Sequence, residues 1–426
     1  MSFKLPRGTR DILPVDMGVW YFLENKLHAV SRRYGYKEIR TPVFEHTEVF
    51  SRSVGEDTDI VTKEMYSFRD RGDRHITLRP EGTAAITRAY LEHRFDAQPP
   101  PVKLYYYGPM FRYDRPQQGR YRQFYQFGVE CFGVDHPAAD AEVIALTTDF
   151  LEEIGLEDVE LQINSVGCSQ CRGIYRQKLV EYLAPYREQL CNYCHQRFDS
   201  NPLRMLDCKK AECQEIFQYA PEITAVICEE CHKHFSDVQR HLQNLDIEYE
   251  INSRLVRGLD YYTRTAFEFI SSALGAQNSI GGGGRYDNLV EFFGGKQTPA
   301  VGMAMGMERI ITSLQEQKQF SPPHDNLQVL ISAEGEKLLF KAMELAGKLR
   351  KYDITVEVDY TGRSLKSLMK YADKHNYSYV LIWGEREQQK DKITMRNMQA
   401  GDQEELSEQE VVETLKRTTC MQREDK

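Results

Sequence analysis

The chain has 426 residues, more than one ordinary core accommodates, which predicts two to three domains. Its 41% hydrophobic and 28% charged residues are typical of a globular protein, and it shows neither a bilayer-spanning apolar run nor a signal peptide, so we expect a cytoplasmic protein with no membrane segment. A net charge of −9 argues against a nonspecific nucleic-acid coat protein, but not against an enzyme that concentrates basic residues locally.

The first part of the chain, residues 1–165, alternates short β-rich runs with helical ones. Residues 74–78 have the pattern of a strand, and residues 84–95 carry apolar side chains at helical spacing. Two apolar and aromatic runs, 103–113 and 123–134, flank a polar loop. That arrangement is typical of a long antiparallel hairpin.

A helical, cysteine-rich segment, residues 166–252, interrupts this pattern. Strand patterning then returns in residues 255–270 and 300–305. The sequence therefore predicts one domain in two parts, 1–165 and 253–320, with the cysteine-rich segment inserted between them.

Residues 319–326, with two adjacent prolines, are predicted to form a linker. Beyond it, in residues 327–426, strands and helices alternate over about a hundred residues, which indicates a small α/β domain. We expect its strands at 328–332, 355–359, 379–383 and 392–396, and its helices at 335–351, 364–375 and from 407 onwards.

The second strand of the hairpin presents an unusual face. Because residues two apart share a face of a strand, Phe124, Gln126, Gly128 and Glu130 point one way, opposite Phe127. An aromatic ring, an amide and a carboxylate make a poor hydrophobic core but a good floor for a polar ligand.

Arginines gather near the same hairpin. Arg112 lies on the facing strand, and the loop adds Arg115, Arg120 and Arg122. A solvated sheet face with charged loop tips is the alternative interpretation of this segment.

Residues 79–83 join a strand to a helix. Thr83 is a suitable N-cap, and Glu81 near a helix start interacts favourably with the helix dipole. This structural role explains both residues without any ligand.

Two further segments combine charged or aromatic residues with glycine. Residues 255–265 include Arg257, Tyr261 and Tyr262 in a strand-like run, and residues 281–287 begin with four glycines, which let a backbone approach a ligand or a strand closely. No Gly-Lys-Ser or Gly-Lys-Thr follows, so a phosphate-binding P-loop is excluded. A glycine-rich turn without a ligand is the alternative.

Residues 299–309 place small side chains at period two and then open a helix, predicted over 306–318, with Arg309 in its first turn. A strand of small residues leaves room for a planar ring, and a helix N-terminus with an arginine favours phosphate. Close packing alone also explains this pattern.

Together these segments resemble the signature motifs of class II aminoacyl-tRNA synthetases, and the chain closely resembles the histidyl-tRNA synthetase family. The resemblance covers nearly the whole chain and rests on several motifs in the family's order. The matching stretches are residues 8–11, 36–42, 111–114, 257–268, 281–287 and 306–309.

The resemblance implies an α+β fold: a class II catalytic domain, whose antiparallel sheet is flanked by helices, with a helical cysteine-rich insertion and a C-terminal α/β anticodon-binding domain. It also implies ATP-dependent ligation of histidine to tRNA(His) through a histidyl-adenylate, with release of AMP and pyrophosphate. ATP with Mg²⁺ is the implied cofactor, and a homodimer the implied assembly.

For ATP, the resemblance implies that Arg112 binds the α-phosphate and the histidine carboxylate from one side, and that Arg257 approaches from the other. These two residues are the expected catalytic groups. Arg309 is expected to hold the outer phosphates and Phe124 to stack on adenine. Asp114 stands where the class usually has glutamate, which shortens its reach toward ATP.

For histidine, Glu81, Thr83 and Gln126 are expected to hold the α-ammonium group, and Glu130 with Tyr261 or Tyr262 to bond both ring nitrogens. A site that hydrogen-bonds its substrate in this way discriminates by about 10⁴ or more, so we predict no editing domain. The residues implied in binding histidine are Glu81, Gly82, Thr83, Arg112, Gln126, Glu130, Arg257, Tyr261 and Tyr262.

The tRNA acceptor end is expected to meet the hairpin loop at Gln117, Arg120 and Arg122. The C-terminal domain is expected to bind unstacked anticodon bases, with Arg363 and Lys366 as candidate contacts.

Eight of the ten cysteines lie between Cys168 and Cys231. Cys168, Cys171, Cys191 and Cys194 have the spacing of a four-cysteine structural zinc site. A second group is available, with three neighbouring histidines as substitutes, and reduced thiols or disulfides are the alternatives. The second group is Cys208, Cys213, Cys228 and Cys231, and the histidines are His195, His232 and His234.

Two other functions fit parts of the pattern. The regulatory subunit of ATP phosphoribosyltransferase, a catalytically inactive paralogue, shares the catalytic fold but usually lacks the anticodon-binding domain and the arginine at position 257. A zinc-dependent RNA-binding protein explains the cysteines and the loop arginines, but leaves Glu81, Gln126, Glu130 and Arg309 without a purpose.

Overall fold

The computed structural model describes residues 3–55, 58, 60–117, 119–257, 259–274, 278–317 and 328–424. The chain divides into two compact units, Met1–Pro322 and Pro323–Lys426. The predicted linker, residues 319–326, lies outside the described residues. No helix in the described part of the chain is long and apolar enough to cross a membrane.

The first unit is built on an eight-stranded sheet in the order β1-β5-β6-β11-β10-β9-β7-β8. The inner strands are antiparallel, and only the two edge strands, β1 and β8, pair with their neighbours in parallel. The strands are β1 (Lys37–Glu38), β5 (Val102–Phe111), β6 (Gln123–Phe132), β7 (Val159–Ser165), β8 (Glu250–Ile251), β9 (Thr263–Ser271), β10 (Ser279–Arg285) and β11 (Ala300–Gly306).

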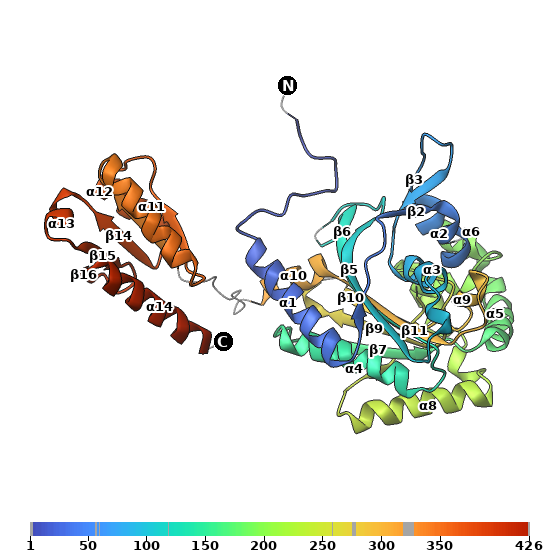
Figure 1. Ribbon diagram of the computed structural model, residues 1–426. Helices are drawn as coiled ribbons and strands as arrows, with labels where there is room; N and C mark the ends of the chain where they lie inside the picture. The colour runs from blue at the N-terminus through green and yellow to red at the C-terminus, as the bar shows by residue number, and fades with distance from the viewer. Residues whose placement is uncertain are drawn as a thin grey trace. The chain divides into compact units, whose positions relative to one another are not determined.

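Helices cover both faces of this sheet (Figure 1). On one face, α1 buries Trp20, Leu23 and Leu27, spaced three and four residues apart, in a core shared with α4 and α10. On the other face, α3, α5 and α9 pack in a second core that includes the tyrosines of the candidate site. These helices are α1 (Met17–Arg33), α3 (Thr83–Glu92), α4 (Ala138–Glu153), α5 (Ser169–Leu183), α9 (Leu289–Phe292) and α10 (Met307–Glu316).

A small three-stranded sheet, ordered β2-β4-β3, lies between α1 and the hairpin in sequence. Its strands and the helical turns around it are β2 (Phe44–His46), β3 (Tyr66–Arg69), β4 (His75–Leu78), α2 (Thr47–Val54), the π-helix η1 (Ile60–Glu64) and η2 (Phe95–Ala97).

The cysteine-rich insertion is helical, as its sequence predicts. Its last helix, α8, packs Phe235, Val238 and Leu242 into the core of the sheet domain. Its elements are α5, η3 (Ala184–Gln189), α6 (Asn192–Arg197), η4 (Pro202–Asp207), α7 (Ala211–Phe217), η5 (Ile223–Ala225) and α8 (Glu229–Asn244).

The second unit is an α/β domain with the strand order β13-β12-β14-β15-β16, parallel in its first three strands and antiparallel in the last two pairings. The predicted strands and helices are all present, and the short α13 and the polar edge strand β16 were not predicted. The elements are β12 (Gln328–Ala333), α11 (Glu336–Arg350), β13 (Thr355–Val358), α12 (Leu365–Lys374), β14 (Tyr379–Trp383), α13 (Glu385–Gln389), β15 (Ile393–Asn397), β16 (Gln403–Leu406) and α14 (Glu408–Glu424).

The strand predicted at 255–270 is shorter than expected, because β9 begins only at Thr263. The described residues before it form turns that contact the insertion. Arg172 donates to the Asp260 carbonyl at 3.1 Å, and Asn201 donates to the Asp260 carboxylate at 3.1 and 3.2 Å. These contacts hold the chain away from the sheet ladder.

Candidate active site

A cavity of about 490 Å³ opens above the sheet of the first unit, with β6, β10 and β11 among the strands that line it. The structure brings together here most of the residues that the sequence singles out. Those that line the cavity are Glu81, Thr83, Arg112, Asp114, Arg120, Phe124, Gln126, Arg257, Tyr261, Tyr262 and Arg309.

Small residues make the floor of this cavity. In the register of the sheet, Gly302 lies beside Glu130, Ala304 beside Gly128, and Gly306 beside Gln126. The glycines of β10 pair with the other edge of β11. Because these positions carry little or no side chain, the floor leaves room for a planar ligand, as the sequence predicts.

Glu81 is buried just before α3 and caps that helix. Its carboxylate accepts the backbone N–H of Thr83 at 2.7 Å and of Ala84 at 2.9 Å. Burial raises the pKa of Glu81, and these backbone hydrogen bonds oppose the shift. The prediction that Thr83 is the N-cap was wrong by one residue, since Gly82 holds that position and the Thr83 hydroxyl donates to Glu130 at 2.7 Å.

Glu130 lies fully buried below the cavity lining. It accepts the hydroxyls of Thr83 and Tyr286, and the contact with Tyr286 was not predicted from the sequence. Gly302 on the intervening strand makes this possible, because a side chain there would overlap the Glu130 carboxylate. Burial raises the pKa of Glu130 to about 8.

Four arginines line the cavity and contribute positive charge: Arg112, Arg120, Arg257 and Arg309. Arg112 donates to the Pro80 carbonyl at 2.8 Å, and its guanidinium lies 5.4 Å from the ring centre of Phe124. Arg309 donates to the Ser279 carbonyl. Burial, followed by repulsion from Arg120, lowers the pKa of Arg309, so this region favours an anion.

Arg257 forms an ion pair with Glu268 at 2.6 Å. Burial opposes its charge, but the Glu268 carboxylate and Tyr262 raise its pKa overall. Several buried side-chain polar atoms of the described residues have no hydrogen-bond partner, and two of them, Arg257 Nε and Gln126 Oε1, belong to residues that line the cavity. Buried polar atoms of native proteins are nearly always paired, so these two atoms indicate where a polar ligand binds.

The remaining predicted residues lie around the cavity. Arg120 forms an ion pair with Asp114, and both residues line the cavity. The guanidinium of Arg122 lies 3.7 Å from the ring centre of Tyr113. Gln117 is exposed and forms a turn with Arg120. Gly82 does not line the cavity. It lies against the ring of Tyr106, where any side chain would overlap that ring.

Three residues of the site were not singled out from the sequence. Tyr286 lies in the glycine-rich stretch but carried no separate signal. Glu268 neutralises Arg257 from the same stretch of chain. Glu308 accepts the Tyr125 N–H with both carboxylate oxygens at 3.0 Å, and burial raises its pKa to about 7.

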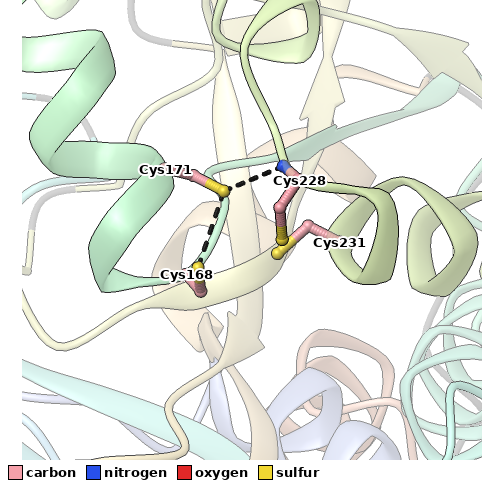
Figure 2. A group of neighbouring side chains, drawn as sticks. All are labelled: Cys168, Cys171, Cys228 and Cys231. Carbon is pink, nitrogen blue, oxygen red and sulfur yellow. Dashed lines mark hydrogen bonds between the residues drawn. The ribbon is translucent and has the colours of Figure 1, made fainter.

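The cysteines form two groups, but not the predicted ones. The first quartet is Cys168, Cys171, Cys228 and Cys231, and the second quartet is Cys191, Cys194, Cys208 and Cys213. The predicted set of Cys168, Cys171, Cys191 and Cys194 was therefore wrong. The first and last helices of the insertion, α5 and α8, begin side by side, which brings together cysteines far apart in sequence (Figure 2).

Comparison with known proteins identifies the family. The model of the histidyl-tRNA synthetase family matches residues 8–181 and 204–310, and that of the anticodon binding domain matches residues 328–418. A histidine–tRNA ligase of Desulforamulus reducens is 54% identical, with 97% of this chain and 99% of that protein covered. This chain belongs to the histidyl-tRNA synthetase family.

Solved structures agree with this assignment. The apo histidyl-tRNA synthetase of S. aureus is 39% identical, with a TM-score of 0.82, and the match covers 97% of this chain and 100% of that one. The predicted fold is confirmed: a class II catalytic domain with a C-terminal anticodon-binding domain. A Bacillus halodurans structure described as ATP phosphoribosyltransferase regulatory subunit/histidyl-tRNA synthetase, 24% identical with a TM-score of 0.66, shares the fold alone and covers 90% of this chain and 99% of that one.

Proposed function

We propose that this chain ligates L-histidine to tRNA(His) in two steps. The histidine carboxylate attacks the α-phosphate of ATP, which forms histidyl-adenylate and releases pyrophosphate. A terminal ribose hydroxyl of the tRNA then takes the histidyl group, and AMP leaves. Neither step needs a covalent enzyme intermediate, so positioning and charge stabilisation provide the catalysis.

Arg112 and Arg257 stabilise the α-phosphate during the first step. Both guanidinium groups face one cavity, and the unpartnered Nε of Arg257 among the described residues is the observation that carries this assignment. Phe124, already beside Arg112, stacks on adenine, and Arg309 binds the outer phosphates. ATP enters as its Mg²⁺ complex, so this metal arrives with the substrate.

Histidine binds at the end of the cavity nearest α3. Glu81 and Gln126 hold the α-ammonium group together with Thr83, and the buried Gln126 Oε1 supplies an acceptor that lacks a partner among the described residues. Tyr261 and Tyr262 contact the imidazole. Glu130 acts from below, because it fixes the hydroxyls of Thr83 and Tyr286.

The tRNA binds at two places. Its acceptor end meets the hairpin loop at Gln117, Arg120 and Arg122, and the second unit binds the anticodon. In that unit, Arg363 pairs with Asp359 at 2.5 Å, and Lys366 is exposed.

The enzyme acts as a homodimer in the cytoplasm, where charged tRNA is used. Large apolar side chains are exposed near the motif at residues 36–42, which in class II synthetases lies at the dimer interface. They are Val43 and Phe44, which follow this motif directly. Exposed apolar surface of this kind marks protein interfaces. Light scattering on the purified protein tests this assembly, with a mass of two chains expected and a mass of one chain contradicting it.

Aminoacylation of a tRNA(His) transcript tests the proposed function. With histidine and ATP, we expect histidyl-tRNA to accumulate and AMP to be released in equal amount. Histidine binding to a folded protein without any charging of the transcript would instead assign the chain to the regulatory paralogue.

A further inference from the structure

The insertion holds eight cysteine sulfurs in two compact groups that the proposed reaction does not use. Within each quartet, all four sulfurs lie within 4.8 Å of one another. Cys168 Sγ lies 3.5 Å from Cys171 Sγ, and Cys191 Sγ lies 3.8 Å from Cys208 Sγ. Figure 2 shows the four side chains of the first quartet converging from two helix starts.

These separations fit one tetrahedral ion in each quartet. Zinc–sulfur bonds of about 2.3 Å place the four sulfurs of a tetrahedral site about 3.8 Å apart. A disulfide needs its sulfurs at about 2.05 Å, and the described cysteines are all free thiols. An iron–sulfur cluster interposes inorganic sulfide between iron and holds its cysteines further apart than a single ion does.

We propose that this chain binds two structural zinc ions, one in the first quartet and one in the second. Four thiolates close the coordination shell and leave no position for water or substrate, so neither ion takes part in chemistry. The proposal rests on the cysteine geometry alone and does not depend on the proposed ligase activity.

The surroundings of the first quartet favour thiolates. The Cys228 N–H donates to Cys171 Sγ at 3.0 Å. Cys168 and Cys228 are the N-caps of the long helices α5 and α8, whose N-termini stabilise negative charge. Hydrogen bonds of this kind orient the ligands of a metal and tune their basicity.

The second quartet has the same kind of support. The Cys191 N–H donates to Cys213 Sγ at 3.3 Å, and the Lys210 N–H donates to Cys208 Sγ at 3.5 Å. Cys191 and Cys194 fall within residues 182–203, which the family model does not match. The other two cysteines of this quartet, Cys208 and Cys213, lie within residues 204–310, which the family model does match, so the site spans matched and unmatched parts of the insertion.

The two ions have different places in the fold. The first quartet joins the start of α5, where the chain enters the insertion, to the start of α8, which packs into the core of the sheet domain. The second quartet holds the loop around Cys208, whose neighbours Asp207 and Lys209 line the active-site cavity. The zinc ions thus fix one wall of the cavity as well as the insertion itself.

Metal analysis of protein purified without chelators is the first test. We expect two equivalents of zinc per chain. Zinc well below one equivalent, or iron in its place, would overturn the proposal. Titration of the unmodified protein with an organomercurial should release both ions as eight thiols react. This second readout does not depend on any variant folding.

Alkylation followed by mass spectrometry tests the pairing. In the variant Cys171→Ser/Cys231→Ser we expect one equivalent of zinc, with Cys168 and Cys228 newly alkylated and the second quartet still protected. New alkylation at Cys191 and Cys194, with Cys228 protected, would contradict the pairing.

Two matched controls exclude a general effect of substitution in the insertion. His195→Ala and His232→Ala change exposed residues directly after Cys194 and Cys231. Both are expected to retain two equivalents of zinc. Loss of an ion from either control would show that histidine completes a site and would overturn the four-thiolate assignment.

Discussion

The floor of the active site and the cysteine-rich insertion are built by different rules. The floor is three neighbouring antiparallel strands, and the register of these strands decides which side chains meet. In the insertion, the helices α5 and α8 place cysteines together across as many as 63 positions of sequence, as Cys168 and Cys231 show. The alternation of residues along a strand predicts which side chains share a face. The sequence around one cysteine pair does not predict which other pair lies beside it in the fold.

The two regions are also expected to differ in role: the cavity carries out the reaction, and the insertion stabilises the structure around it. Substitutions in the cavity should change the reaction while the protein remains folded, whereas loss of the quartets should first change the metal content and the shape of the cavity wall. The segment that contains Arg257 lies where the two regions meet, since the insertion holds Asp260 through Arg172 and Asn201.

The largest effect is expected for Arg257→Ala. Removal of a charged group that stabilises the transition state lowers the rate by about 10² to 10³. We expect ATP–pyrophosphate exchange with histidine to fall by that factor while the zinc content stays unchanged. Arg254→Ala is the control, because this arginine is exposed, its guanidinium donates to the Gln218 carbonyl, and it does not line the cavity.

An exchange rate for Arg257→Ala within threefold of the parent would remove Arg257 from the catalytic residues. A similar loss in Arg254→Ala would show that the segment as a whole, and not the Arg257 guanidinium, is what the reaction requires.

Glu130→Gln should change how stability depends on pH. The pKa of Glu130 is raised to about 8 in the folded protein from an ordinary value of 4.5. The contribution of the protonated carboxyl to the free energy of unfolding is therefore fully present below pH 4.5 and is lost as the pH rises through 8. In the absence of ligands, the free energy of unfolding of the parent should fall by about 1 kcal/mol per pH unit more than that of the variant between the two pKa values. Denaturant unfolding at several pH values measures the difference, and parallel pH profiles for the two proteins would contradict it.

Gly302→Ala tests the register of the floor. The added methyl group would overlap the Glu130 carboxylate and the neighbouring strand, and overpacking of a tight core costs about 1–3 kcal/mol. Gly306→Ala on the same strand is the matched control, because its new methyl group meets only Arg309, at 3.7 Å. Equal midpoints of denaturant unfolding for the two variants would refute the packing argument.

The smallest effect is expected for Gln117→Ala in the hairpin loop. Loss of one hydrogen bond to the tRNA should raise the KM for tRNA(His) by about 3–10-fold. ATP–pyrophosphate exchange, which needs no tRNA, should stay unchanged. Gln98→Ala alters another exposed glutamine and should change neither value. An unchanged KM in Gln117→Ala would place the acceptor end elsewhere.

Local periodicity predicted most of the fold, and the resemblance to the histidyl-tRNA synthetase family predicted most of the residues that line the cavity. The faces of β6 are as expected, with Phe127 in the core and Gln126 in the cavity. What it missed depends on contacts between distant residues. Tyr286 reaches Glu130 only because Gly302 lies between them, and nothing in either local pattern indicates that meeting.

The predictions of the helix N-cap at Thr83 and of the strand start at residue 255 were wrong for a related reason. Thr83 has a side chain suited to an N-cap, but its hydroxyl donates to Glu130. The carboxylate of Glu81 accepts the free backbone N–H at the start of the helix instead. The strand expected from residue 255 is interrupted by contacts to the insertion. In each case a contact with a distant part of the chain outweighs the local preference.

The measurement that tests the central claim most directly is ATP–pyrophosphate exchange with each of the twenty amino acids separately. The account predicts exchange with histidine alone, because only its imidazole matches the tyrosine-lined end of the cavity. Exchange with another amino acid at a comparable rate, or exchange with none by a folded protein, would contradict it.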